Sequence, residues 1–242
     1  MLLIEDYKMK KKKQIIIILS VILLVLVIVA LRLYFLNNQS DEQAKNADKV
    51  ELEEDYILDA GNDLYITEIS PYSGPYMEDG SDEEVSDVMM IKVTNRGEHP
   101  LQYAEITLTG EEDSLFRLST LSPGETVMIL EANRRAFDQQ EEFTQATTAN
   151  VVFFEKALNF YEDIFQIQGL DGGLNIKNIS KQDVNDEIIV YFKDCEDDLL
   201  VGGITYRGRI SDGLKAGEMK QLMSENFSQN HTKVMFVTIA GK

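Results

Sequence analysis

The sequence predicts an all-β outer region behind one N-terminal transmembrane α-helix, and three observations carry this prediction. A long apolar run stands near the start, between a lysine-rich flank and an acidic remainder. Beyond it, short β-branched or alternating runs are separated by Gly, Asn, Asp and Pro, which is typical of strands joined by turns. These runs fall into two series with matching phrases, which predicts two tandem small β-sandwich modules.

The apolar run from Ile15 to Leu36 is interrupted only by Ser20 and Arg32. At about 1.5 Å per residue, a helix of this length spans roughly 33 Å, enough for a hydrocarbon core of about 30 Å. A cleaved signal peptide is the alternative, but its apolar region is usually shorter and ends at a small-x-small site. No such site and no lipid-attachment cysteine follows the run. We therefore predict an uncleaved signal anchor across 14–36.

The charges on either side of the anchor predict its orientation. Residues 1–13 carry five lysines against two acids, whereas residues 37–242 carry 17 Lys and Arg against 40 Asp and Glu. Lysines before a span keep that end inside the cell. We predict that 1–13 is a cytoplasmic basic tail and that the acidic remainder is extracytoplasmic. A surface this acidic repels phosphate backbones, so the partners exclude nucleic acid.

Composition also indicates the setting of the outer region. Cys195 is the only cysteine, so no intramolecular disulfide is possible. An exported eukaryotic domain more often carries paired cysteines, and we therefore favour the cell envelope of a Gram-positive bacterium. The polar segment 37–56, rich in Glu and Asp, reads as an acidic stalk or linker between the membrane and the first module.

The first series of strand signals predicts a module over 57–136. We expect strands at 64–69, 88–94, 103–109, 116–121 and 126–132. Between the first two of these, residues 72–87 contain Gly74, Pro75, Gly80 and many acids. This composition predicts an exposed loop.

The second series predicts a module over 151–242, after a polar linker at 137–150. We expect strands at 164–168, 174–179, 187–193, 201–210, 218–224 and 233–239. The first two flank Asp171, Gly172 and Gly173, in which glycines supply the positive φ of a hairpin turn. Residues 216–227 also fit helical spacing, and of the two readings we favour the strand.

Matching phrases suggest that the two series are copies of one plan. In each copy a strand ends in asparagine, at Asn95 and at Asn178, and is followed by a turn and another β-rich run. Each copy later carries a Leu-x-x-Gly-Glu phrase, at 121–125 and at 214–218. We interpret this phrase as a leucine in the core, a tight turn that needs glycine and the start of a new strand.

At these residues the sequence resembles the FxLYD-like domains, small β-sandwich modules that recur on bacterial surfaces. The matching features are the strand that ends at Asn178, the run 188–194 and the Leu-x-x-Gly-Glu turn. The layout, with phrases such as those at 202–207 and 234–238, is similar to that of an uncharacterised group of membrane-anchored extracytoplasmic proteins from anaerobic Gram-positive bacteria. The resemblance implies a fold and a location, and it implies no activity.

Sortase-like transpeptidase chemistry is one candidate activity, because an anchor, a β-rich domain and a cysteine occur together. It requires a thiolate beside cationic groups. Here Cys195 lies among acids, which raise the pKa of a thiol. His99 with Arg207 or Arg209 would complete a triad only if the fold brought them together. We therefore assign no catalytic residue.

Metal and cofactor sites are not predicted either. His99 and His231 stand alone in turn-like surroundings, without a second histidine at zinc-ligand spacing. The glycine pairs 172–173 and 202–203 lie in or beside strands, as hairpin or bulge glycines do, and not at a strand-to-helix phosphate loop. Two acid clusters offer oxygens that calcium prefers, but neither has EF-hand spacing, and we interpret them as solvated. They are Glu78, Asp79, Asp82, Glu83, Glu84 and Asp87, and Asp194, Glu196, Asp197 and Asp198.

The function that the sequence favours is a non-enzymatic, membrane-tethered binding or scaffolding protein at the cell envelope. Its expected partner is another envelope or membrane protein, recognised through sheet edges and loops. An envelope transpeptidase or hydrolase with an unrecognised site is the alternative, and an accessory subunit of a secretion or transport complex is a third possibility.

Overall fold

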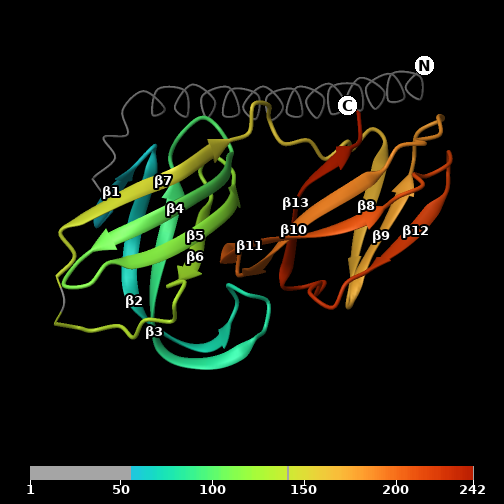
Figure 1. The fold of residues 1–242 in the computed structure, drawn as a ribbon. Coiled ribbons are helices and arrows are strands. Elements are labelled where there is room, and N and C mark those ends of the chain that lie inside the picture. The colour runs from blue at the N-terminus through green and yellow to red at the C-terminus, as the bar shows by residue number, and fades with distance from the viewer. Residues whose placement is uncertain (1–55, 141, 242) are drawn as a thin grey trace, which may run out of the picture. The chain divides into compact units, whose positions relative to one another are not determined.

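The computed structural model describes residues 56–140 and 142–241, which are built from strands and turns with no helix (Figure 1). All of them belong to one compact unit, Asp55–Lys242. The predicted all-β class of the outer region is thereby confirmed. The predicted tail, anchor and most of the stalk, 1–55, lie outside the described residues. Among the described residues no helix is long and apolar enough to cross a membrane.

The strands fall into two sets of six that have the same order. The first repeat contains β2 Leu64–Tyr76, β3 Glu83–Asn95, β4 Leu101–Thr109, β5 Ser114–Leu121, β6 Thr126–Leu130 and β7 Gln145–Phe153, and it is preceded by β1 Leu58–Gly61. The second repeat contains β8 Phe165–Leu170, β9 Gly173–Asn178, β10 Ile188–Glu196, β11 Leu199–Ile210, β12 Met219–Met223 and β13 Thr232–Ile239.

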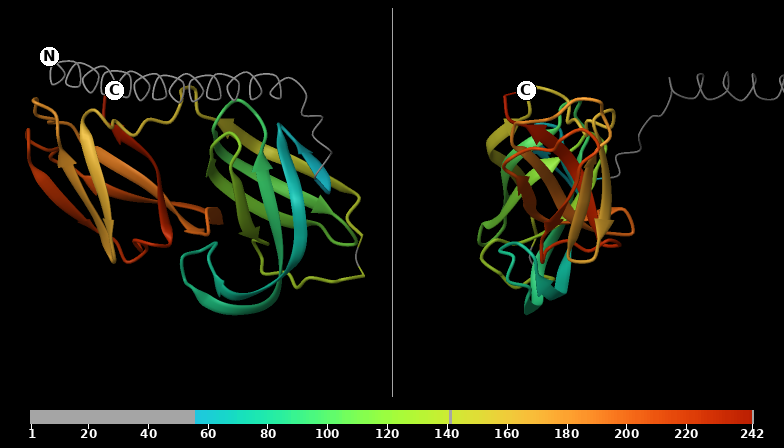
Figure 2. Two further views of the ribbon diagram at one scale, coloured as in Figure 1. Left: turned by 180° about the vertical axis from the view of Figure 1, so that it is seen from behind. Right: turned by 90° about the vertical axis from the view of Figure 1, so that its right-hand side faces the viewer.

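Each repeat is built from two packed layers. In the first repeat β2-β3-β6 faces β5-β4-β7, and in the second β8-β9-β12 faces β11-β10-β13, with every pairing inside these layers antiparallel. Alternating apolar residues from both layers meet between them, as in a β-sandwich. Figure 2 shows these layers from behind and from the side. The strand β6 also pairs with β11, in parallel, so that one seven-stranded sheet, β1-β2-β3-β6-β11-β10-β13, runs through both repeats.

The predicted strands are found close to their expected bounds, including the strand at 219–223 that competed with a helix. The turn at Asp171 and Gly172 joins β8 to β9, and Gly172 has φ +77°. The division into modules at 57–136 and 151–242 stays a prediction, because both repeats belong to one compact unit.

Two segments differ from the prediction. Residues 72–87 are not a simple loop: β2 and β3 remain paired to Tyr76 and Glu83, and form a long hairpin that we call the acidic hairpin. Most of its acids are exposed, but Glu78 is only partly exposed and Tyr76 is buried against Val88. Composition alone does not predict this burial. Within the predicted linker 137–150, residues from Gln145 onward form β7 and pair with β4. As an edge strand β7 exposes alternate polar side chains, and therefore resembles a linker in sequence.

The two Leu-x-x-Gly-Glu phrases form the same hydrogen-bonded turn. In the first repeat the Asn95 backbone N donates to the Glu125 carbonyl, the Gly124 N donates to the Asn95 carbonyl, and Asn95 Nδ2 donates to the Leu121 carbonyl at 2.9 Å. In the second repeat Asn178 makes the same three bonds, with Glu218, Gly217 and Leu214 respectively. Both asparagines are fully buried.

The side-chain oxygens of these asparagines are used in the same way too. Asn95 Oδ1 accepts from the Gly97 N, and Asn178 Oδ1 accepts from the Ser180 N. Each Nδ2 has a second acceptor, the carbonyl of His99 or of Gln182. A buried amide with every donor and acceptor occupied stabilises one backbone arrangement over its alternatives. The asparagine therefore fixes the path of the chain at the same point of both repeats.

Candidate functional site

The junction between the repeats is formed by an insertion in β11. In the pairing of β10 with β11, Phe192 faces Tyr206 and Asp194 faces Val201, so that residues 202–205 bulge opposite Lys193 alone. In the matching pair of the first repeat, β4 and β5 run without such an interruption. Gly202 adopts φ +79°, which suits glycine. The glycine pair is thus a bulge, as the sequence predicts.

Gly203 brings the bulge into backbone contact with the first repeat. A Cβ atom on Gly203 would lie 1.9 Å from the Arg117 carbonyl oxygen, which only glycine avoids. The Gly203 N donates to Glu78 Oε2 at 2.8 Å, and Ser119 Oγ donates to the Gly203 carbonyl at 2.7 Å. Thr205 Oγ1 donates in turn to the Ser119 carbonyl. The bulge is therefore hydrogen-bonded to β5 and to the acidic hairpin at once.

Two further contacts join the repeats beside the bulge. Val127 and Met128 of β6 pair in parallel with Leu200 and Val201 of β11. Lys233 on β13 forms a 2.8 Å ion pair with Glu125. Backbone pairing, a close glycine contact and an ion pair together hold the repeats in one arrangement.

A lysine is buried inside this junction. Lys193 is fully buried, and its Nζ donates to the Ser119 carbonyl at 2.8 Å. Burial lowers the pKa of Lys193 to about 7, although the negative charge of Glu78 opposes this shift. Strand alternation from Ile188, Val190 and Phe192 would place Lys193 outside, so the sequence offered no direct signal of its burial.

The carboxylate of Glu78 lies in the same region. Its two oxygens accept from the backbone N of Leu130, at 2.9 Å, and from that of Gly203. Burial raises the pKa of Glu78, and these bonds and Lys193 act in the opposite direction. Glu78 is therefore a structural acceptor in the junction and not the solvated acid that the sequence indicates.

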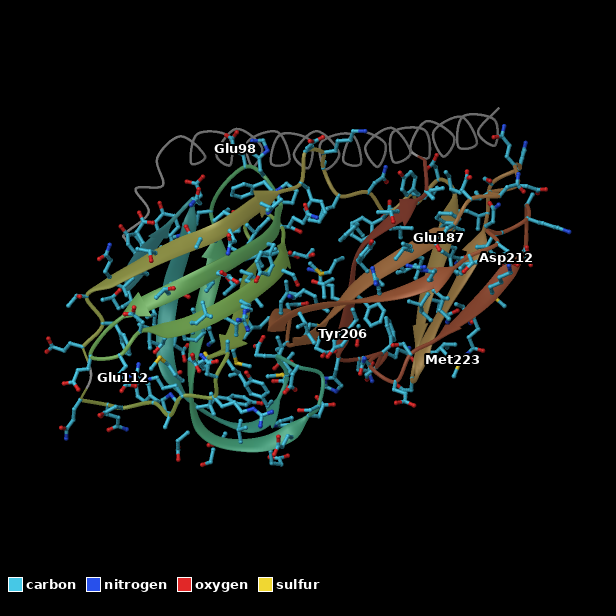
Figure 3. The ribbon with its side chains drawn as sticks, in the orientation of Figure 1. Glu98, Glu112, Glu187, Tyr206, Asp212 and Met223 are labelled. Atoms are coloured by element: carbon cyan, nitrogen blue, oxygen red, sulfur yellow. The ribbon has the colours of Figure 1, made fainter. Side chains whose placement is uncertain are left out.

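The two acid clusters approach each other at this point. Burial and the charge of Asp82 raise the pKa of Asp194 to about 6. Burial and the charges of Asp194 and Asp82 raise the pKa of Tyr206, labelled on β11 in Figure 3, to about 12. A Cβ atom on Gly80 would lie 4.0 Å from the Tyr206 hydroxyl oxygen, so the tip of the acidic hairpin lies beside β11. The distance between these segments in the sequence gave no reason to expect this contact.

The acids of the hairpin are partly neutralised by one arginine. Arg134 donates to Glu83 Oε2 at 2.6 Å and to Asp79 Oδ2 at 2.9 Å, and its guanidinium lies 4.4 Å from the centre of the Tyr76 ring. In the part of the chain that the structure describes, no group of three or more His, Cys, Asp or Glu side chains is arranged to hold a metal ion.

A cleft of about 280 Å³ opens between the repeats beside these contacts. Its walls come from the acidic hairpin, from β4, β5 and β6, and from the bulge of β11. The lining residues are Tyr76, Glu78, Asp79, Tyr103, Arg117, Leu118, Ser119, Leu130, Ala132, Arg134, Gly203 and Ile204. It combines an apolar floor with tyrosines and arginines, the composition of many recognition sites.

Arg117 is the cation in the cleft with the weakest local pairing. Its side chain is 55% exposed, and its Nε lies 3.8 Å from Glu105 Oε1, which is longer than a hydrogen bond. Glu105 meanwhile accepts from the Tyr103 hydroxyl and from Asn150 Nδ2. The guanidinium of Arg117 is therefore placed to bind an incoming acceptor.

In the described part of the chain, no hydrogen bond or ion pair of the side chains joins Cys195 to His99, Arg207 or Arg209. Arg207 lies on β11 opposite Tyr191. Cys195 lies on β10 and packs against a core cluster that includes Leu200 and Phe236 as well as residues of the first repeat. Burial raises the pKa of its thiol, which disfavours the thiolate. His99 lies near Phe153, and Arg209 pairs with Glu187 at 3.3 Å. His231 is the last residue of the β12–β13 loop, and its carbonyl accepts from the Cys195 backbone N.

No protein-family model, curated protein or solved structure matches this chain.

Proposed function

We propose that this protein is a non-enzymatic, membrane-tethered binding or scaffolding protein of the cell envelope. In this proposal two tandem β-sandwich modules form the extracytoplasmic region, and a partner protein binds in the cleft between them. The tether is the apolar run at 14–36, whose length and lysine-rich flank support a single span with the N-terminus in the cytoplasm. The kind of bacterium, a Gram-positive one, is proposed on cysteine usage alone.

The observation that carries the proposal is the way in which the cleft is built. Both repeats supply its walls, and the junction that holds them includes the Gly203 contact and the Lys193 hydrogen bond. A surface that is held in place before binding loses little conformational entropy when a partner docks. Tyrosine and arginine, which line this cleft, are the residues that most often dominate binding energies in protein interfaces.

A comparison of variants tests the proposal. The full-length chain, solubilised in detergent and immobilised, is used to capture partners from solubilised membranes, with Arg117→Ala and Ile204→Asp tested beside the unchanged chain. We expect one partner to be retained by the unchanged chain and reduced at least about tenfold by each variant, since interface hot spots contribute about 1.4 kcal/mol or more.

Arg209→Ala is the matched control, because Arg209 is equally exposed and ion-paired but lies outside the cleft. It should leave capture unchanged. Equal capture by all the variants would contradict the role of the cleft. The tether is tested separately: protease added to intact cells should digest the acidic region, and its survival until the cells are opened would contradict the topology.

A further inference from the structure

The repeats differ at the edge of the layer that begins with β2 or β8. Asn95 pairs with Leu64, and Asn178 pairs with Phe165, so these two strands occupy the same place in their repeats. Counting from the asparagines, Ile66 on β2 corresponds to Ile167 on β8. Any element found beside Ile66 therefore has a definite equivalent position beside Ile167.

In the first repeat that position is filled by β1. Leu58 of β1 pairs with Ile66, and the Ile57 N donates to the Ile66 carbonyl at 2.7 Å. Ala60 of β1 is 3% exposed and belongs to the core. At its far side Asn62 Nδ2 donates to Thr148 Oγ1 on β7. The short strand thus closes the gap between the edge strands of the two layers.

In the second repeat the chain takes another path before it enters β8. The Phe165 N donates to the Tyr161 carbonyl, and upstream of this turn the Asn159 carbonyl accepts from the Val237 N on β13. The segment therefore crosses to β13 instead of running along β8. Among the described strands β9 is the only one that pairs with β8, which leaves the other edge of β8 open.

A groove of about 300 Å³ lies where the missing strand would be. It runs between the edge strands β8 and β13, the equivalents of β2 and β7, and the loop before β13 closes one end. Its apolar lining includes Phe160, Phe165, Ile167, Gly169, Phe227 and Val234. Phe160 is 40% exposed, whereas Phe165 and Phe227 are nearly buried. Glu162 and Thr232 are the polar residues of the lining. The groove is therefore mainly apolar, formed in advance and bordered by an unpaired strand edge.

We propose that this groove binds an extended segment of a partner protein, which adds to β8 as a short strand in the place that β1 takes in the first repeat. Backbone pairing with the outward-facing groups of Ile167 supplies affinity. The two inward positions of the segment, two residues apart, carry a branched aliphatic and a small residue, as Leu58 and Ala60 do in β1. The strongly acidic surface favours a segment without acidic flanks.

This site is separate from the cleft between the repeats and shares none of its lining residues. The inference adds a second contact surface to the proposed binding protein, and each can fail without the other.

A labelled synthetic peptide with the sequence of residues 56–63, in which Asp59 and Asp63 are replaced by Asn, is the probe, because it carries the apolar pattern of the strand that fills the equivalent place without its acidic groups. Binding to the full-length chain in detergent is followed by fluorescence anisotropy. We expect the peptide to bind at least tenfold more tightly than a second peptide of the same charge in which Leu58 and Ala60 are both Asn. Equal binding of the two peptides would overturn the proposal.

Variants of the chain locate the binding. Phe160→Asp changes an exposed rim residue of the groove, and Ile167→Pro removes an outward-facing N–H from an edge strand, a position where proline is tolerated. Each variant should weaken binding of the peptide at least tenfold. Met219→Asp, on the other edge of the same layer, is the matched control and should not change binding.

Other outcomes separate the alternatives. Equal peptide binding by Phe160→Asp and Met219→Asp would show that the peptide exchanges with β1 in the first repeat, and would overturn the proposal. Self-association of the chain that Phe160→Asp abolishes would assign the groove to a second copy instead of a partner. Arg117→Ala should leave peptide binding unchanged, so that a failed groove is distinguished from a failed cleft.

Discussion

The two repeats share the asparagine that fixes their turns and differ at the surfaces through which they meet other chains or each other. Asn95 and Asn178 make matching sets of hydrogen bonds. By contrast, only the second repeat has the bulge at 202–205, and only the first has an added strand at its edge. The shared part stabilises each repeat, and the parts that differ determine what each repeat contacts.

A second difference concerns the strands that correspond across the repeats, β6 and β12. In β6 Val127 is fully buried and pairs with β11 of the other repeat. The equivalent residue of β12, counted from the Gly-Glu phrase, is Lys220, whose Nζ donates to Asp212 Oδ1 and to the Gly213 carbonyl. A lysine on an edge strand discourages further pairing. Lys220 therefore disfavours the pairing of a further strand with the edge of β12.

The largest loss of stability should come from replacing the asparagine that the two repeats share. Asn95→Ala and Asn178→Ala each leave buried backbone carbonyls without donors, and an orphaned buried group costs about 1–3 kcal/mol. We expect each variant to lower the free energy of unfolding by about 3 kcal/mol, measured by urea denaturation of the full-length chain. Gln166→Ala, on an exposed position of β8, serves as the control. A loss below about 1 kcal/mol in one repeat alone would show that the two turns are not equivalent, and such a loss in both would contradict the stabilising role of the asparagine.

Gly203→Ala should separate the repeats while leaving each one folded. The new methyl group would meet the Arg117 carbonyl, and overpacking of this kind costs about 1–3 kcal/mol. We expect faster hydrogen exchange at Val127 and Leu200, where β6 and β11 pair, with little change at Asn95 and Asn178.

Gly208→Ala is the matched control for this variant, since it lies on the same strand. The nearest atom to a Cβ there is Cδ1 of Leu222, the flexible end of a side chain. Unchanged exchange at the pairing of β6 with β11 in Gly203→Ala would show that the bulge does not hold the junction.

The junction should also make stability depend on pH. The pKa of Lys193 is about 7 in the folded protein and 10.5 when unperturbed. Between these values the unfolded chain holds a proton that the folded chain has released, so stability rises with pH, by at most about 1.4 kcal/mol per unit. For Asp194, with a pKa raised from 3.8 to about 6, stability falls as pH rises through that interval. Together these groups give lowest stability near pH 6–7.

Lys193→Met isolates the part due to lysine. It should flatten the rise of the urea midpoint between pH 7 and pH 9, while the fall between pH 4 and pH 6 remains. Lys233→Met, which removes an exposed cation of the same junction, should leave the rise in place. A rise that persists in Lys193→Met would assign the pH dependence to other groups.

Local patterns in the sequence were sufficient for the strands and for the shared turn. Alternation located the strands, and the Leu-x-x-Gly-Glu phrase with its asparagine predicted the matching turns, because both leave a local residue pattern in the sequence. The hydrogen bonds that complete each turn join residues far apart in the chain, Asn95 to Leu121 and Asn178 to Leu214. The junction depends on contacts between residues far apart in sequence, such as Lys193 with Ser119 and Gly203 with Glu78. The glycine pair at 202–203 indicated a hairpin or a bulge, but not the backbone that the bulge would contact.

The prediction made from the charges of residues 72–87 was wrong for a related reason. The acidic hairpin was expected to be a solvated loop, since composition cannot show that Arg134 lies over Tyr76 and pairs with two of its acids. No residue pattern in the sequence predicts the open groove beside β8 either. The groove exists because, among the described strands, β1 has no counterpart beside β8.

The smallest effect on stability is expected at the edge strand β12. Lys220→Val gives β12 the residue that β6 has at the equivalent position, and it removes an ion pair in which Asp212 is mostly exposed, a contact worth less than about 1 kcal/mol. The free energy of unfolding should therefore change little. The apolar edge should instead favour pairing between molecules, seen as concentration-dependent association in sedimentation velocity. Lys177→Val, on the central strand β9, removes the same charge without altering an edge, and should stay monomeric under conditions in which Lys220→Val associates.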